Sequence, residues 1–173
     1  LGVGCGTGQT AIHLARQGYA VVAIDIAPSA LQLARQAADR AAAKLDWRLE
    51  DFMSQPATGT YAAVLDRGVF HIFRDADAVA FARQVADSLT EGGLWISICG
   101  SCDDRTEPTS FPKTTVTNIA RAVEQFFEID TVQRCGFAAA GGHSFSAWVC
   151  LFRKRPGLAS RDLAQAPHDA AAA

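Results

Sequence analysis

Three glycines near the start of the chain, Gly4, Gly6 and Gly8, alternate with other residues after a short apolar stretch and before a run of helical periodicity. Glycine has no Cβ, so such a turn lets backbone N–H groups approach a ligand closely. A second apolar run, residues 20–24, ends in Asp25, whose carboxylate could accept hydrogen bonds from ribose hydroxyls. Together these residues predict a nucleoside-binding site at the carboxyl ends of two neighbouring strands.

The spacing of the glycines does not fit the dinucleotide fingerprint. A G-x-G-x-x-G motif that starts at Gly4 needs a glycine where the chain has Gln9, and Gly8 comes one position early. NAD(P) is therefore the less favoured cofactor. An NAD(P)-dependent oxidoreductase stays open as an alternative function, and so does a non-catalytic module that keeps the fold for binding.

Residues 3–8 followed by Asp25 resemble motif I and the acidic end of the second strand in class I S-adenosylmethionine (SAM)-dependent methyltransferases. The resemblance implies SAM as the cofactor and methyl transfer to a small-molecule acceptor, with no metal required because a sulfonium methyl is already activated. This family usually has Asp or Glu two positions before the first motif glycine, where the chain has Gly2. The residues that the resemblance places at the cofactor are Gly4, Cys5, Gly6, Gly8, Asp25, Ile26, Asp51, Phe52 and Asp66.

Two further strand ends carry candidate residues for the same site. Residues 45–50 alternate between apolar and polar and lead to Asp51 and Phe52, where the resemblance implies contact with the adenine amine and the ring face. A near-continuous apolar run, residues 61–65, predicts a central strand buried on both faces. Because ligands of open α/β sheets bind beyond the carboxyl ends of the strands, the polar cluster that follows should face the glycine turn.

That cluster contains the candidate catalytic residues Asp66, Arg67 and His71. A neutral imidazole at His71 could take a proton from an oxygen or nitrogen acceptor, whereas a thiolate acceptor needs no base. The alternative, that His71 packs in the core or caps the next helix, stays open. The string Asp66-Arg67-Gly68 with His71 is similar to the thiol and thiopurine S-methyltransferase and tellurite-resistance branch, which implies a thiol or another soft nucleophile as the acceptor.

The remaining periodicities predict the fold class. It is an α/β, Rossmann-like, doubly wound and mostly parallel seven-stranded sheet with a C-terminal antiparallel hairpin and helices on both faces. We expect residues 1–155 to form a SAM-binding domain with an incomplete N-terminus, and residues 156–173 to form a disordered or frayed tail. The expected helices cover residues 10–17, 28–43 and 75–89 and begin again near 115, and the helical spacing of the third places Phe81 in the core. The expected strands cover 20–25, 45–50, 61–65, 94–99, 128–133 and 144–153, and Gly136-Phe137 allows a turn between the last two.

Composition narrows the function classes. A net charge of −2, with scattered Lys and Arg, offers no basic field for nucleic acid, and no apolar run approaches the ~20 residues of a transmembrane helix. We therefore expect a cytoplasmic protein that acts on a small molecule. The pair Cys99 and Cys102 forms a C-x-x-C, but a redox or zinc role is disfavoured because no second ligand pair accompanies it. A polar loop at residues 100–113 is long enough to act as a lid.

Overall fold

A computed structural model describes residues 1–55, 57–102, 112–138 and 144–157 of the chain. The predicted lid, apart from its ends, and most of the predicted tail lie outside these residues. The strands are β1 (Gly2–Val3), β2 (Val22–Asp25), β3 (Asp46–Leu49), β4 (Tyr61–Arg67), β5 (Leu89–Gly100), β6 (Phe127–Ala138) and β7 (Ser144–Lys154). The helices are α1 (Gln9–Arg16), α2 (Pro28–Arg40), the short 3₁₀ helix η1 (Phe70–Ile72), α3 (Asp75–Asp87) and α4 (Val116–Val123).

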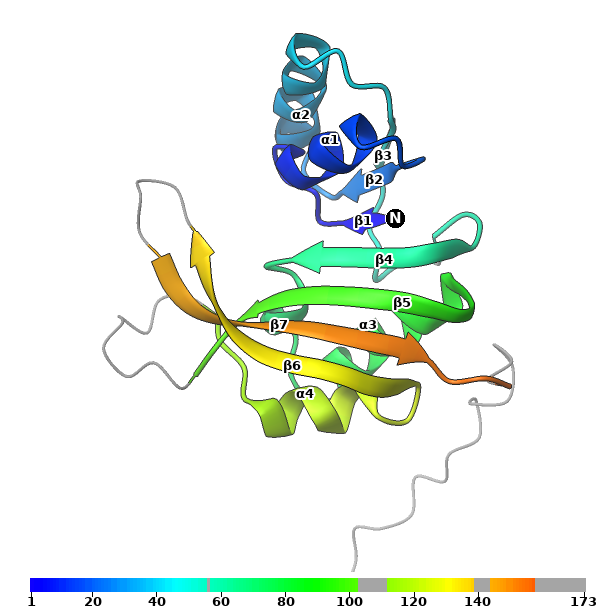
Figure 1. Cartoon of the computed structure of the whole chain (residues 1–173), viewed down its shortest axis with the longest axis vertical. Coiled ribbons are helices and arrows are strands. Elements are labelled where there is room, and N and C mark those ends of the chain that lie inside the picture. Colours follow the sequence, from blue (N-terminus) through cyan, green and yellow to red (C-terminus); the bar gives the residue numbers. More distant parts are fainter. Residues whose placement is uncertain (56, 103–111, 139–143, 158–173) are drawn as a thin grey trace, which may run out of the picture.

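The strands form one seven-stranded sheet in the order β3-β2-β1-β4-β5-β7-β6. Strands β1 to β5 pair in parallel, whereas β7 is antiparallel to both β5 and β6. Figure 1 shows α1 and α2 beside the short strands β1 to β3, with α3 behind the longer strands. The predicted fold class, including the antiparallel C-terminal hairpin, is confirmed.

Local sequence signals explain where the first helices begin and end. Helix α1 begins directly after Gly8, which is left-handed at φ 79°, and ends before Gly18, which is left-handed at φ 90°. Glycine reaches this conformation without the steric cost that a Cβ adds. Helix α2 starts with Pro28 in its first turn, where the missing N–H costs no hydrogen bond.

An aromatic cluster around Trp95 fills the space between the sheet and α3. The Trp95 ring is fully buried and lies 5.0 Å from the centroid of Phe70, 4.8 Å from Phe152 and 5.3 Å from Phe127. Phe81 of α3 is also fully buried, as its helical spacing predicted. This cluster fixes one face of β4 and β5, because alternate residues of each strand point into it.

The largest differences between predicted and observed element boundaries lie at three places. Strand β5 starts at Leu89, because the parallel pairing with β4 already begins at Tyr61 and passes through an irregularity before Ala63. Strand β6 runs on to Ala138 and includes the Gly136 and Phe137 that were expected to turn. Helix α2 ends at Arg40. No helix within the described ranges is long and apolar enough to cross a membrane.

Candidate functional site

The glycine turn is built around three left-handed residues with different surroundings. A side chain at Gly4 would overlap Val69, and a Cβ at Gly8 would lie 2.5 Å from the Trp47 ring. By contrast, a Cβ at Gly6 would meet no atom within 4 Å. Packing therefore explains the glycines at both ends of the turn, while the open space at Gly6 is where a ligand could approach the backbone.

The carboxylate of Asp25 faces this turn. Its Oδ2 atom accepts a hydrogen bond from the Gly6 N–H at 2.7 Å, and its Oδ1 accepts one from the Ala27 N–H at 2.9 Å. A carboxylate has about four acceptor sites, so each oxygen can still accept from a ligand hydroxyl. The side chain of the next residue, Ile26, is 68% exposed and offers apolar surface beside the acid. The turn and the acid thus form one hydrogen-bonded unit.

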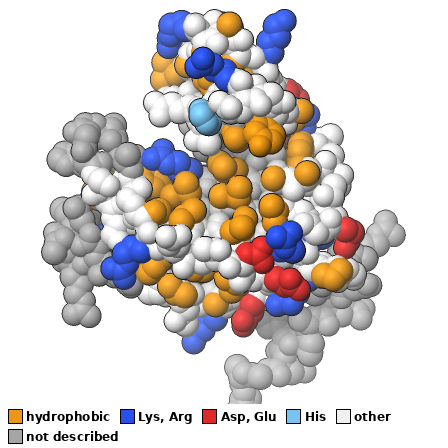
Figure 2. Space-filling view, viewed as in Figure 1, with side chains coloured by type: hydrophobic (Ala, Val, Ile, Leu, Met, Phe, Trp, Pro, Cys, Tyr) orange, Lys and Arg blue, Asp and Glu red, His pale blue; other side chains and the backbone are white. Residues whose placement is uncertain are grey.

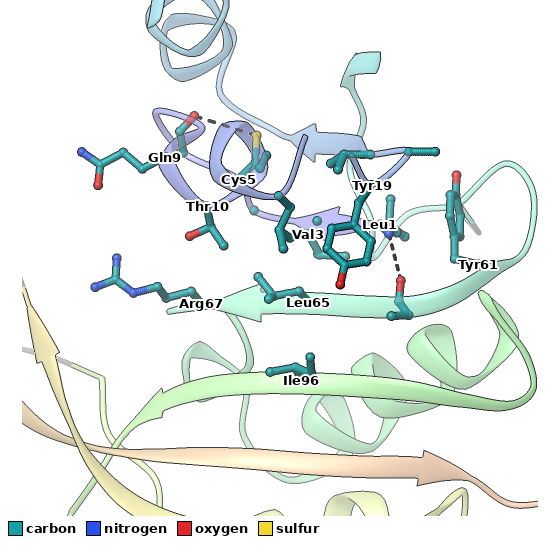
Figure 3. Close-up of a pocket in the computed structure, with 18 of the residues that line it drawn as sticks. Leu1, Val3, Cys5, Gln9, Thr10, Tyr19, Tyr61, Leu65, Arg67 and Ile96 are labelled. Carbon is teal, nitrogen blue, oxygen red and sulfur yellow. Dashed lines mark hydrogen bonds between the residues drawn. The ribbon is translucent and has the colours of Figure 1, made fainter. Parts of the chain in front are cut away.

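A cavity of about 600 Å³ opens beside the turn and continues beneath α1 along the face of β4 and β5 (Figure 3). Its volume lies in the range of small-molecule sites. Apolar side chains gather on this face of the sheet below α1 (Figure 2). The described residues that line the cavity include Gly4, Cys5, Gly6, Gln9, Thr10, Tyr19, Tyr61, Leu65, Arg67 and Ile96.

Cys5 lines this cavity as a neutral thiol. Burial, followed by the nearby charge of Asp25, raises the pKa of the Cys5 thiol to about 12. Both effects disfavour the thiolate, which is the nucleophilic form. Cys5 can therefore contribute a surface for a ligand but not a reactive sulfur.

Asp51 and Phe52, which follow the end of β3, have different surroundings. The Asp51 carboxylate accepts from the Met53 N–H and the Ser54 hydroxyl, and the Ser54 bond is the main cause of its lowered pKa. The Phe52 ring is buried in the core, 5.4 Å from the Phe81 ring. Packing therefore holds the Phe52 ring in the core, and its contact with an adenine stays a prediction. Asp51 stays a predicted adenine contact.

Asp66 lies in the interior, on the face of β4 that packs against α3. It is fully buried, and its carboxylate accepts hydrogen bonds from the Phe70 N–H at 3.0 Å and from the Trp95 indole N–H at 2.8 Å. The hydroxyl of Ser97, opposite in the sheet, lies near it without reaching hydrogen-bonding geometry. Burial raises the Asp66 pKa. This arrangement supports a structural role for Asp66, and its predicted catalytic and cofactor-binding roles stay predictions.

His71 is also buried, with 1% of its surface exposed. Its Nδ1 atom accepts a hydrogen bond from the Gly100 N–H at 2.7 Å, which assigns the proton of the neutral ring to Nε2. Burial, together with the positive charge of Arg74, lowers the His71 pKa to about 4. Since Nδ1 is already bonded, this geometry does not support the predicted general base. It supports the alternative that His71 packs in the core and joins η1 to the end of β5.

Replacing His71 by asparagine should flatten the pH dependence of stability. The pKa falls from an ordinary 6.5 to about 4 on folding, so the unfolded chain binds the proton first as pH drops. The stabilisation from the neutral ring is complete above pH 6.5 and is lost between about 6.5 and 4, a change of about 3 kcal/mol. Urea unfolding across this pH range measures the slope.

The exposed His13 of α1 supplies the matched control, because His13→Asn removes a histidine without touching the interior. That variant should keep the pH dependence of the unmodified protein. An unchanged slope in His71→Asn would contradict the assignment of a neutral, buried ring to His71.

Arg67 is the predicted catalytic residue that does line the cavity. Its guanidinium lies 4.2 Å from the centroid of the Phe137 ring, a cation–π distance. The same ring lies over Gly68, 3.3 Å from where a Cβ would stand. Sequence reasoning missed Phe137, because it placed this residue in a turn and not opposite the end of β4.

The two cysteines of the C-x-x-C do not form a common site. Cys99 is fully buried and Cys102 is exposed. A hydrogen bond with Cys150, followed by burial, raises the Cys99 pKa. Within the described part of the chain, no three His, Cys, Asp or Glu side chains are grouped so as to hold a metal ion.

Comparison with known proteins identifies the family. The family model for a methyltransferase domain matches residues 1–93, which is more than half of the chain, and the chain belongs to this family. The predictions of a class I SAM-dependent methyltransferase and of SAM as the cofactor are therefore confirmed at the level of the family.

Curated relatives match part of the chain. A 2-heptyl-1-hydroxyquinolin-4(1H)-one methyltransferase from Mycobacteroides abscessus is 34% identical over 73 residues, which are 41% of this chain and 32% of the relative. A ubiquinone biosynthesis O-methyltransferase from Methylocella silvestris is 34% identical over 96 residues, which are 54% of this chain and 36% of the relative. The chain thus spans about a third of the length of these relatives.

Solved structures share the fold at low sequence identity. One, described for the conversion of a disulfide bond into a thioacetal group during echinomycin biosynthesis, has a TM-score of 0.77 at 21% identity and covers 89% of this chain and 74% of its own. TehB from Haemophilus influenzae has a TM-score of 0.72 at 16% identity and covers 89% and 57%. Magnesium protoporphyrin IX methyltransferase from Synechocystis PCC 6803, with bound SAM, has a TM-score of 0.70 at 17% identity and covers 88% and 68%.

Proposed function

We propose that the whole protein transfers a methyl group from SAM to a small-molecule acceptor. The observation that carries the proposal is the hydrogen-bonded unit of Asp25 and Gly6, with open space at Gly6, in a chain of the methyltransferase domain family. The cavity beside this unit has room for the methionine end of a cofactor. Lone glycines would be weak support, but their combination with the acid is specific to nucleoside recognition.

The residues of this chain would hold the cofactor at three places. Backbone groups of Gly4 and Gly6 would lie along its methionine end, Asp25 would accept from the ribose hydroxyls, and Asp51 would accept from the adenine amine. SAM supplies an activated methyl group on a sulfonium when it is bound. The protein then has to align the acceptor with the carbon–sulfur bond and exclude water from the cavity.

We further propose a thiol or another soft nucleophile as the acceptor, in the branch of thiol and thiopurine S-methyltransferases and tellurite-resistance proteins. The string Asp66-Arg67-Gly68 with His71 and the likeness to TehB support this branch. A thiolate needs no general base, which agrees with the engagement of the His71 Nδ1 atom by Gly100. The name of one curated relative, the ubiquinone biosynthesis O-methyltransferase, favours a second candidate, an oxygen acceptor on a small molecule.

We propose that this chemistry takes place in the cytoplasm and on neither nucleic acid nor a membrane. Support comes from the net charge of −2 and from the scattered Lys and Arg residues. The NAD(P)-dependent oxidoreductase is no longer favoured, because the matching family is one of methyltransferase domains. A non-catalytic binding module of the same fold is the remaining alternative.

Methyl transfer can be measured directly with full-length protein, radiolabelled SAM and a panel of thiols, phenols, amines and halides. We expect labelled product with a small thiol in preference to a phenol or an amine. Transfer only to phenols would favour the oxygen acceptor. Binding of SAM without transfer to any member of the panel would favour the non-catalytic module.

A further inference from the structure

The backbone of the sheet supports the glycine turn unequally on its two sides. Strand β1 has two residues, and its parallel pairing with β4 ends at the pair of Val3 and Asp66. Towards β2 the support continues one step further, because the Cys5 N–H donates a hydrogen bond to the Ile24 carbonyl at 3.0 Å. On the β4 side, the contact that meets Gly4 comes from the side chain of Val69, in the loop that follows β4.

The fit between Gly4 and Val69 is close. A Cβ on Gly4 would overlap the Cγ2 methyl of Val69 and would lie 3.6 Å from its Cβ and 3.8 Å from its Cγ1. The valine methyl group thus occupies the space that a side chain at Gly4 would need. Val69 is half-buried and does not line the cavity beside the turn. Its effect on a ligand in that cavity therefore has to pass through Gly4.

The loop that carries Val69 is anchored on both sides of this residue. The Gly68 N–H donates to the Ile98 carbonyl of β5 at 2.9 Å, and the Phe70 N–H donates to the buried Asp66 carboxylate at 3.0 Å. Two neighbouring strands therefore fix the backbone before and after Val69. Its side chain is a rigid contact against which the first residue of the glycine turn rests.

We propose that Val69 is a positioning residue for the cofactor, an inference that rests on the proposed function. Its methyl groups hold Gly4, and the turn that starts at Gly4 carries the Gly6 N–H to its hydrogen bond with Asp25. A turn that is already held in its binding conformation loses less freedom when the ligand arrives, so the affinity is higher. The loop after β4 thus acts on cofactor binding without touching the cavity.

Calorimetric titration of S-adenosylhomocysteine into full-length protein tests this role, at a temperature where thermal unfolding shows each variant to be folded. Val69→Ala, which removes both γ carbons, should weaken binding about tenfold. Val69→Ile keeps both γ carbons and should stay within about threefold of the unmodified protein. Val132→Ala in β6 is the matched control, because Val132 is also half-buried, packs against the same core and does not line the cavity. Its affinity should be unchanged.

A second substitution reverses the sign of the effect. Gly4→Ala puts a methyl group where the Val69 Cγ2 lies and should weaken binding, whereas in Gly4→Ala/Val69→Ala the new methyl takes the space that Cγ2 leaves, 3.6 Å from the remaining Cβ. Val69→Ala should therefore tighten binding about tenfold when Gly4→Ala is present. The backbone strain at φ 61° is common to both variants that carry Gly4→Ala, so it does not affect this comparison.

The inference would be overturned by unchanged affinity in Val69→Ala, by an equal loss in Val132→Ala, or by a double variant that binds more weakly than Gly4→Ala. A valine that supports only the folded state would change thermal unfolding and leave the affinity of the folded protein as it is. If Val69→Ala did not fold, the comparison of Gly4→Ala with the double variant would decide. If the unmodified protein bound no S-adenosylhomocysteine, the proposed function would fail and the inference with it.

Discussion

Replacing Gly6 by leucine should lower the affinity for S-adenosylhomocysteine about a hundredfold, whereas Gly18→Leu should change it by less than about twofold. Both glycines are left-handed, at φ 54° and φ 90°, and a Cβ at either would meet no protein atom within 4 Å. The backbone strain of about 1–2 kcal/mol is therefore shared by the two variants. Only Gly6 lines the cavity, so only there does the new side chain take the place of a ligand.

Calorimetric titration of both variants, alongside thermal unfolding, separates binding from folding. We expect similar losses of stability in the two proteins and a loss of binding in Gly6→Leu alone. Equal binding by the two variants would mean that the open space at Gly6 is not part of the cofactor site. Gly18 follows the C-terminal end of α1, whereas the glycine turn precedes its N-terminal end. Gly18→Leu therefore tests a left-handed glycine outside the proposed site.

Replacing Asp66 by alanine should lower the free energy of unfolding by about 3 kcal/mol, one of the larger effects of a single substitution. The change leaves the N–H groups of Phe70 and Trp95 buried without their acceptor. Part of this loss is offset because the buried carboxylate, whose pKa is raised by burial, is itself costly to desolvate. Asp66→Asn should lose less, since an amide oxygen can still accept from one of the two donors.

Urea unfolding measures this loss, and S-adenosylhomocysteine binding at low temperature shows whether the site survives in the folded fraction. We expect both variants of Asp66 to bind once they are folded. An Asp66→Ala protein that is as stable as the unmodified one but unable to transfer methyl groups would support the catalytic role predicted from the sequence and contradict the structural one. Val69 follows Asp66 by three residues and packs on Gly4 of the glycine turn. A substitution at Asp66 that moves Val69 would therefore change cofactor binding indirectly.

The sequence was sufficient to predict the parts of the site that depend on backbone geometry. A glycine at a left-handed turn and an acid at the end of the next strand indicate a nucleoside site through backbone conformation and strand order, which do not depend on side-chain packing. Gly6 and Asp25 could therefore be placed together. The helical spacing of α3 likewise identified Phe81 as a core residue. These predictions use periodicity and local conformation, which a single sequence carries.

Predictions that depend on which face of a strand is covered could not be made. The alternation of β4 puts Asp66 and Arg67 on opposite faces, but the sequence does not state which face α3 covers. The polar cluster was therefore treated as one group, although Asp66 and His71 are buried while Arg67 lines the cavity. The sequence did not indicate Phe137 as a site residue, because Phe137 and Arg67, which are in contact, lie 70 positions apart in the chain.

Calorimetric titration of S-adenosylhomocysteine into full-length protein and its Asp25→Ala variant tests the central claim, that the glycine turn and Asp25 together hold the nucleoside. The account predicts saturable binding by the unmodified protein and a loss of binding of about a hundredfold or more in Asp25→Ala, with partial recovery in Asp25→Asn, which keeps one acceptor oxygen. Unchanged affinity in Asp25→Ala would contradict it.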